Sequence, residues 1–159
     1  MREELKETKK LGNKGFSLIE LIIVIAIMAI LIGIVGTQVV PYIEKSKQAK
    51  DQQVIGSLLT SATAAFSSNV EKYDSTAAQE FTFDEDATTG DELESVINEF
   101  HALCGYAKLD DLKANLTSKA GKEIDGITIA RDTNGKVTVT VAMESDSEYT
   151  TVFEELSST

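Results

Sequence analysis

A single carboxylate lies inside an otherwise apolar segment near the N-terminus. Residues 16–36 contain one charged side chain, Glu20, among mostly aliphatic residues. A carboxylate at the centre of a membrane helix costs about 2.5–3.5 kcal/mol on insertion scales. Glu20 is only about 6 Å along a helix from residue 16, so the membrane interface or the helix N-terminal dipole would lower that cost. The retained charge predicts a partner for this segment.

The apolar segment has the length of a membrane span. As a helix, residues 16–36 would measure about 31 Å, which matches a hydrocarbon core of about 30 Å. Five Lys or Arg side chains precede it in residues 1–15, and three Lys side chains follow it in residues 41–55. This bias predicts a cytoplasmic N-terminus and an exported C-terminal part. Without residues 1–15 the net charge moves from −11 to −13, which argues against a general nucleic-acid binder.

The N-terminus differs from an ordinary secretory signal. Such a signal has its small-residue cleavage site after the apolar stretch. Here the apolar stretch is longer, no A-x-A site follows it, and the small residue Gly15 precedes it. Cleavage at Gly15 would leave the apolar helix on the mature protein.

Residues Lys14-Gly15-Phe16-Ser17-Leu18-Ile19-Glu20 resemble the processing site of type IV prepilins and related pilin-like proteins. The resemblance extends over about residues 9–60 and is specific in its Gly, Phe, Glu and long aliphatic run. It implies that a prepilin peptidase cuts between Gly15 and Phe16 and methylates the Phe16 amine. It also implies that Glu20 is the assembly residue, which neutralises the Phe16 amine of a neighbouring subunit. The residues alone leave open an internal ion pair between Glu20 and its own Phe16 amine.

Small residues form one face of the expected helix. Ala26, Ala29, Gly33 and Gly36 recur at helical spacing, and large Ile and Leu side chains cover the rest. Helices in lipid associate through close packing, which small residues allow. We therefore predict a helix-packing face, with a plain single-pass anchor as the alternative. Pro41 cannot donate its amide and its ring crowds the preceding turn, so a kink or local melting is expected over residues 33–41.

The rest of the chain predicts an α+β fold. The expected architecture is a long N-terminal helix, comprising a transmembrane or filament-core half and an amphipathic half, packed on a small antiparallel sheet with short helices between. One helix would cover residues 16–70, and an apolar stripe marks its outer half. That stripe is Val54, Ile55, Leu58, Leu59, Ala62, Ala65 and Phe66. Shorter helices are expected over residues 93–104 and 109–116, and a strand is expected over residues 81–83.

A β-hairpin is expected from Ile124 to Met143. Alternating Ile and Val residues flank Asp132-Thr133-Asn134-Gly135, and Asn-Gly suits the positive φ of a tight turn. Residues 149–156 are expected to form a third strand, with a helix as the competing interpretation. The resemblance agrees, because pilin-like domains commonly end in a sheet.

No catalytic or metal site is predicted. His101 has no nearby Cys or second His, and Cys104 is expected to be a buried apolar side chain. Asp84, Asp86 and Thr88 alternate before Gly90, but the displaced glycine and the absent closing Glu favour a solvated acidic loop over a calcium site. We expect no metal, no cofactor and no enzyme activity.

These observations predict three parts: a leader over residues 1–15, a transmembrane and polymerisation helix over residues 16–40, and an extracellular domain over residues 41–159. The resemblance implies a structural subunit of a type IV pilus, with adhesion, aggregation or surface motility following from the filament. Its implied partners are further copies of the chain, the peptidase and methyltransferase, the inner-membrane platform with its assembly ATPase, and the cytoplasmic membrane before assembly. The alternatives are a pseudopilin of a type II secretion or DNA-uptake system, and an enzyme on a membrane anchor.

Overall fold

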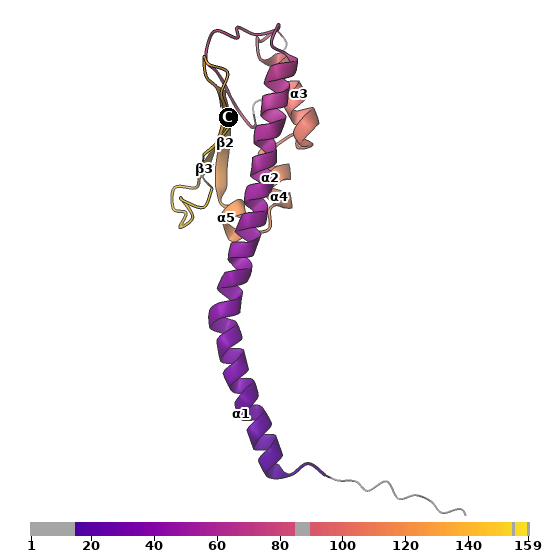
Figure 1. Cartoon of the computed structure of the whole chain (residues 1–159), viewed down its shortest axis with the longest axis vertical. Helices are drawn as coiled ribbons and strands as arrows, with labels where there is room; N and C mark the ends of the chain where they lie inside the picture. The colour runs from indigo at the N-terminus through magenta and orange to yellow at the C-terminus, as the bar shows by residue number, and fades with distance from the viewer. Residues whose placement is uncertain (1–14, 85–89, 154, 159) are drawn as a thin grey trace, which may run out of the picture. The chain divides into compact units, whose positions relative to one another are not determined.

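The computed structural model describes residues 15–84, 90–153 and 155–158. Helical residues run from Leu18 to Ser68 through α1 (Leu18–Ile34), a π-helical segment η1 (Val35–Val39) and α2 (Val40–Ser68) (Figure 1). The chain divides into two compact units, Met1–Val40 and Pro41–Thr159. We call these the N-terminal unit and the C-terminal unit.

The C-terminal unit contains a four-stranded antiparallel sheet in the order β1-β2-β3-β4. Its strands are β1 (Gln79–Thr82), β2 (Ile124–Arg131), β3 (Val137–Met143) and β4 (Leu156–Ser157). The helices α3 (Glu94–Cys104), α4 (Leu109–Asn115) and α5 (Lys119–Lys122) lie between β1 and β2 in the chain. The α+β prediction of a long helix, a small antiparallel sheet and short intervening helices is confirmed.

The predicted hairpin is confirmed in its strands and its turn. Strands β2 and β3 pair so that Ile129 lies opposite Val139. The Asp132 carboxylate accepts hydrogen bonds from the backbone amides of Asn134 and Lys136, each at 2.8 Å. Gly135 has a φ of +89°, a conformation that residues with a Cβ rarely adopt.

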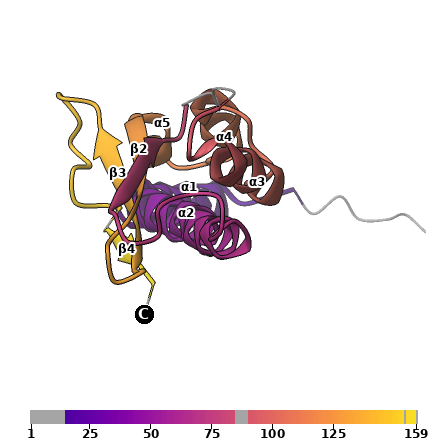
Figure 2. The same cartoon turned by 90° about the horizontal axis from the view of Figure 1, so that it is seen from above.

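The core lies between one face of the sheet and the helices α2, α3 and α4 (Figure 2). The predicted α2 stripe faces this core: Ile55, Leu58, Ala62, Ala65 and Phe66 are buried, and Val54 and Leu59 are partly buried. Phe81 of β1 joins the layers, because its ring centroid lies 6.1 Å from that of Phe66 and 5.5 Å from that of Phe100 on α3. Aromatic pairs at such distances add to the burial energy.

Among the described residues of the segment 149–156 only Leu156 lies in a strand, so neither the expected third strand nor the competing helix is present over its predicted length. Residues 148–152 form turns, with the Val152 amide donating to the Tyr149 carbonyl at 3.0 Å. Strand β4 covers only Leu156–Ser157. Ser158 then fixes the end of the sheet, because its amide donates to Val137 O at 2.8 Å and its hydroxyl accepts from Val137 N at 2.9 Å. The short strand β4 is therefore placed by its contacts with β3, which the local sequence pattern of residues 149–156 does not indicate.

Two further sequence predictions need correction. Cys104 is half-buried rather than buried, and its thiol lies 3.4 Å from the Tyr106 carbonyl. The expected helix over residues 16–70 instead begins at Leu18, changes type at Val35–Val39 and ends at Ser68. Asp86 and Thr88, on which the calcium alternative depended, lie outside the described residues.

Candidate processing and assembly site

The expected cleavage position lies directly before α1. Gly15, Phe16 and Ser17 are not helical, and Ser17 has the extended N-cap conformation with φ −70° and ψ 143°. The Phe16 side chain is 92% exposed. The Gly15–Phe16 bond is thus in non-helical chain, which a peptidase can bind in extended form.

Glu20 caps its own helix in this uncut chain. The Ser17 amide donates a hydrogen bond to the Glu20 carboxylate at 2.8 Å. This is the S-x-x-E capping arrangement, in which the N3 side chain satisfies an amide that the helix leaves unpaired. The cap was not among the expectations from the sequence, although the Ser-x-x-Glu spacing indicates it. The carboxylate is exposed, so it remains accessible to another molecule.

The predicted helix-packing face is open. Ala26, Ala29, Gly33 and Gly36 are all exposed, and a Cβ added to either glycine would meet nothing within 4 Å. No residue of α1 is buried, and its large side chains are between 47% and 77% exposed. An apolar helix with this exposure requires lipid or other helices to cover it.

The segment before Pro41 changes helix type. The Val40 amide donates to Val35 O, the i→i−5 bond of a π-helix. The Thr37 hydroxyl donates to Gly33 O at 3.1 Å and lies 3.4 Å from Ile34 O. Pro41 lies inside this continuous helical run and has no amide to donate, so the change of helix type comes directly before a break in the backbone hydrogen-bond ladder. The described structure has a π-helical segment here in place of local melting, and loosening on assembly stays a prediction.

The helical run is also long and apolar enough to cross a membrane. Its most apolar window has a mean hydropathy of 3.2, and none of that window is buried within the chain. The apolar part corresponds to residues 18–40, whereas charged and polar residues follow from Glu44 onward.

Residues 10–36 match the family model described as the prokaryotic N-terminal methylation motif. The chain carries this methylation motif. The match includes Gly15, Phe16, Glu20 and the four small residues of the helix-packing face, of which Gly36 lies in η1 and the others in α1. No curated protein and no solved structure matches the chain.

The methylation motif supports a precursor of the type IV pilin or pseudopilin kind. It implies processing by a prepilin peptidase and handling by an assembly machinery, and with the apolar helix it indicates membrane anchoring before assembly. The match ends at residue 36. The fold of the C-terminal unit is described by the structure, but no family is assigned to that unit. The roles of single residues within the motif remain predictions.

Outside the methylation motif, a buried carboxylate fastens α2 to the segment before α5. Asp51 has no exposed surface, and its two oxygens accept hydrogen bonds from the amides and hydroxyls of Thr117 and Ser118 at 2.6–3.2 Å. Burial acts to raise the pKa of Asp51, but the hydrogen bonds from Ser118 and Thr117 outweigh it and leave the pKa lowered. Ser118 also caps α5, since its hydroxyl accepts from Gly121 N at 3.0 Å.

Sequence reasoning missed this arrangement. A charged residue on the buried side of an amphipathic helix, three residues before the stripe begins, was the available signal. Its partners lie 66 and 67 positions later, a separation at which no local pattern could identify them.

The two other side chains considered as functional candidates, His101 and Cys104, contact backbone carbonyls of the fold. The His101 ring nitrogen Nε2 lies 3.0 Å from Phe83 O, and burial raises the pKa of the Cys104 thiol. Within the described ranges, no group of three or more His, Cys, Asp or Glu side chains is placed to hold a metal ion.

Proposed function

We propose that the chain is the structural subunit of a type IV pilus. A prepilin peptidase cuts between Gly15 and Phe16, the Phe16 amine is methylated, and α1 is retained to form the filament core. The C-terminal units coat the filament, which serves adhesion, aggregation or motility. Separate proteins supply the ATP-driven assembly.

The observation that carries this proposal is the complete exposure of α1 within the chain. A helix that buries no side chain, follows a processing motif and presents small residues on one face is suited to lateral packing against copies of itself. The C-terminal unit, by contrast, holds all the buried residues described, from Asp51 to Phe153. It can therefore remain folded while α1 exchanges lipid for other helices.

In this proposal Glu20 sets the axial register between neighbouring α1 helices in the filament. In the uncut chain its carboxylate accepts only the Ser17 amide among the described residues. Cleavage creates a charged amine at Phe16 in every subunit. A carboxylate in a water-poor core needs such a partner, and a misregistered helix would leave both charges unpaired. Pairing between neighbours then favours one axial position.

Two substitutions separate assembly from capping. Gln can replace Glu in a capping box but carries no charge, so E20Q keeps the cap and loses the ion pair, whereas E20V loses both. We expect both variants to be cut at Gly15 yet to give less than about a tenth of the wild-type filament yield, since losing a buried pair costs about 3–5 kcal/mol. The yield is measured by electron microscopy and by sheared filament mass per cell.

Normal filaments from E20Q would show that capping alone is needed, and normal filaments from E20V would contradict any role for Glu20. The wild type also distinguishes the pilus from the pseudopilin alternative. Abundant extended surface fibres support the pilus, whereas short structures confined to the periplasm or wall support a pseudopilin.

A further inference from the structure

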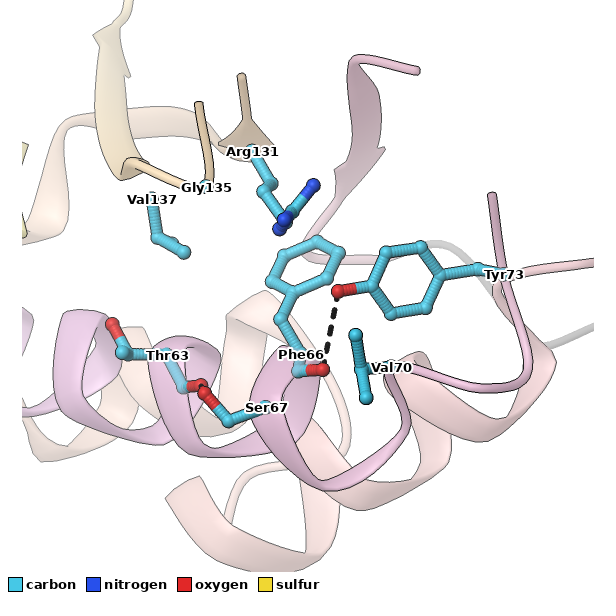
Figure 3. Close-up of a pocket in the computed structure, with 8 residues that line it drawn as sticks. All are labelled: Thr63, Phe66, Ser67, Val70, Tyr73, Arg131, Gly135 and Val137. Atoms are coloured by element: carbon cyan, nitrogen blue, oxygen red, sulfur yellow. Dashed lines mark hydrogen bonds between the residues drawn. The ribbon is translucent and has the colours of Figure 1, made fainter. Parts of the chain in front are cut away.

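A cavity of about 220 Å³ opens where α2 ends beside the β2–β3 turn. Figure 3 shows its lining: Phe66 and Ser67 come from α2, Tyr73 from the segment after it, Arg131 from the end of β2, and Val137 from the start of β3. Its walls are therefore aromatic and aliphatic, with the hydroxyl side chains of Thr63 and Ser67 and one cationic group.

The guanidinium of Arg131 is held in a fixed position. Its Nη1 atom donates to Ser75 O at 3.0 Å and to Asp132 O at 3.3 Å. The guanidinium carbon lies 5.6 Å from the centroid of the Tyr73 ring, within range of a cation–π interaction. The Tyr73 hydroxyl in turn donates to Phe66 O at 3.2 Å, so the ring is also fixed.

This cation has no carboxylate partner in the part of the chain that the structure describes. No hydrogen bond from Nη2 or Nε is found there, and the ion pair present is Lys113 with Glu144. The adjacent Asp132 carboxylate is occupied by the Asn134 and Lys136 amides. Nη2 lies against Gly135, where an added Cβ would come within 3.3 Å of it.

The lack of a carboxylate partner for Arg131 is unexpected because the chain is strongly acidic. Arg131 is the sole arginine after residue 15, in a segment that carries 23 Asp and Glu residues. An arginine fork with free N–H groups and restricted motion is suited to binding a carboxylate through two hydrogen bonds. The aromatic and aliphatic walls reduce the screening of that pair by water.

We propose that this cavity binds the carboxylate of an Asp or Glu side chain from a neighbouring copy of the chain in the filament. This inference rests on the proposed function, because the filament supplies acidic C-terminal units at a high local concentration. The ligand is one carboxylate per cavity, with Arg131 as its ionic partner and the Phe66 and Tyr73 rings beside it. Such a pair would link C-terminal units in addition to the packing of α1.

The first test compares R131Q with K136Q in sheared filaments of the full chain. Lys136 is exposed and lies in the same hairpin but does not line the cavity, so K136Q makes the same change of charge. We expect R131Q to release about fivefold more subunit on mild heating than the wild type or K136Q, because interfacial charge pairs add stability. We also expect its filaments to lose most of their sensitivity to salt.

The second test identifies the partner and does not depend on the fold of R131Q. Filaments of R131K are assembled from a mixture of ¹⁴N- and ¹⁵N-labelled subunits and treated with a carbodiimide, which joins an amine to a carboxylate in contact with it. Mass spectrometry should find the peptide containing position 131 joined to a peptide containing Asp or Glu. Pairs of one ¹⁴N peptide and one ¹⁵N peptide show that the link joins two different subunits.

Links at position 131 within one chain only, or no link there, would overturn the proposal, as would R131Q filaments that match K136Q in heat and salt stability. A wild type that makes no filaments would instead contradict the proposed function itself.

Discussion

Two acidic side chains of the same helical run have opposite surroundings. Asp51 is buried and receives hydrogen bonds from the amides and hydroxyls of two residues. Glu20 is exposed and accepts the Ser17 amide. Burial of a carboxylate is tolerated where its oxygens are satisfied inside the fold. Asp51 therefore stabilises the C-terminal unit, whereas Glu20 remains accessible for a contact outside the chain.

Removing the Asp51 charge should destabilise the C-terminal unit. In D51N the introduced NH₂ group would face amide and hydroxyl donors of Thr117 and Ser118, and those of Ser118 are buried and would lose an acceptor. We expect the free energy of unfolding to fall by about 2–3 kcal/mol. The measurement is urea unfolding of the full chain in detergent micelles, followed by the near-ultraviolet circular dichroism of tyrosine.

The matched control is D146N, because Asp146 is exposed. Its free energy of unfolding should stay within about 0.5 kcal/mol of the wild type. Equal stability of D51N and D146N would show that the hydrogen bonds to Asp51 contribute nothing net.

The lowered pKa of Asp51 predicts a specific dependence on pH. The folded state holds this proton less tightly than the unfolded state, whose Asp pKa is about 3.9. The contribution of Asp51 is thus fully present above about pH 4 and is lost as pH falls through the folded pKa. The difference in unfolding free energy between wild type and D51N should therefore be constant from about pH 5 to 7 and should shrink below about pH 4. A difference that grows on acidification would contradict the assigned direction of the pKa.

At the scale of elements, local patterns predicted those parts whose core-facing side chains repeat within the element. The α2 stripe, the amphipathic α3 and the β2–β3 hairpin all have this property, and each is present. The hairpin turn was also encoded locally, by Asp132 and Gly135. The periodicity of 3.6 or 2 residues is sufficient information for such elements.

Elements that depend on distant contacts could not be predicted in this way. α5 has only four residues and begins at Lys119, after the N-cap Ser118, whose position is set by Asp51 on α2. β4 has two residues and is fixed by the pairing of Ser158 with Val137. The candidate site divides similarly: Gly15, Phe16 and Glu20 were identifiable from a motif, whereas Asp51 and the Arg131 cavity require the fold.

The close approach of α5 to α2 predicts opposite effects for two glycine substitutions. A Cβ at Gly121 would lie 2.8 Å from both the Asp51 carboxylate and Leu116 Cβ, whereas one at Gly56 in α2 would meet nothing within 4 Å. G121A should lower the free energy of unfolding by about 2 kcal/mol. G56A should raise it by about 0.5–1 kcal/mol, because alanine loses less backbone entropy in a helix.

Thermal and urea unfolding of the two variants in the same micelles provides the comparison. If G121A were as stable as the wild type, the contact between α5 and Asp51 would be looser than the geometry indicates. A destabilised G56A would mean that α2 is packed on the Gly56 side by something outside the described residues.

In the whole molecule, the exposed apolar surface lies in the N-terminal unit and the buried hydrophobic core lies in the C-terminal unit. The N-terminal unit exposes the apolar side chains of α1, and the C-terminal unit contains the aromatic and aliphatic core. An exposed apolar helix is stable only in lipid or among other apolar helices. The net charge of −13 after residue 15 keeps the C-terminal units soluble and separate, so association is expected to depend mainly on α1 and on specific pairs such as the one proposed for Arg131.

The proposed function depends above all on α1 being retained after processing and packed against copies of itself. The most direct measurement is intact-mass spectrometry of the subunit in filaments sheared from wild-type cells. We expect a chain that begins at Phe16 and carries one methyl group on its terminal amine. A subunit that keeps residues 1–15, or one cut beyond residue 36 and therefore lacking the apolar helix, would contradict it.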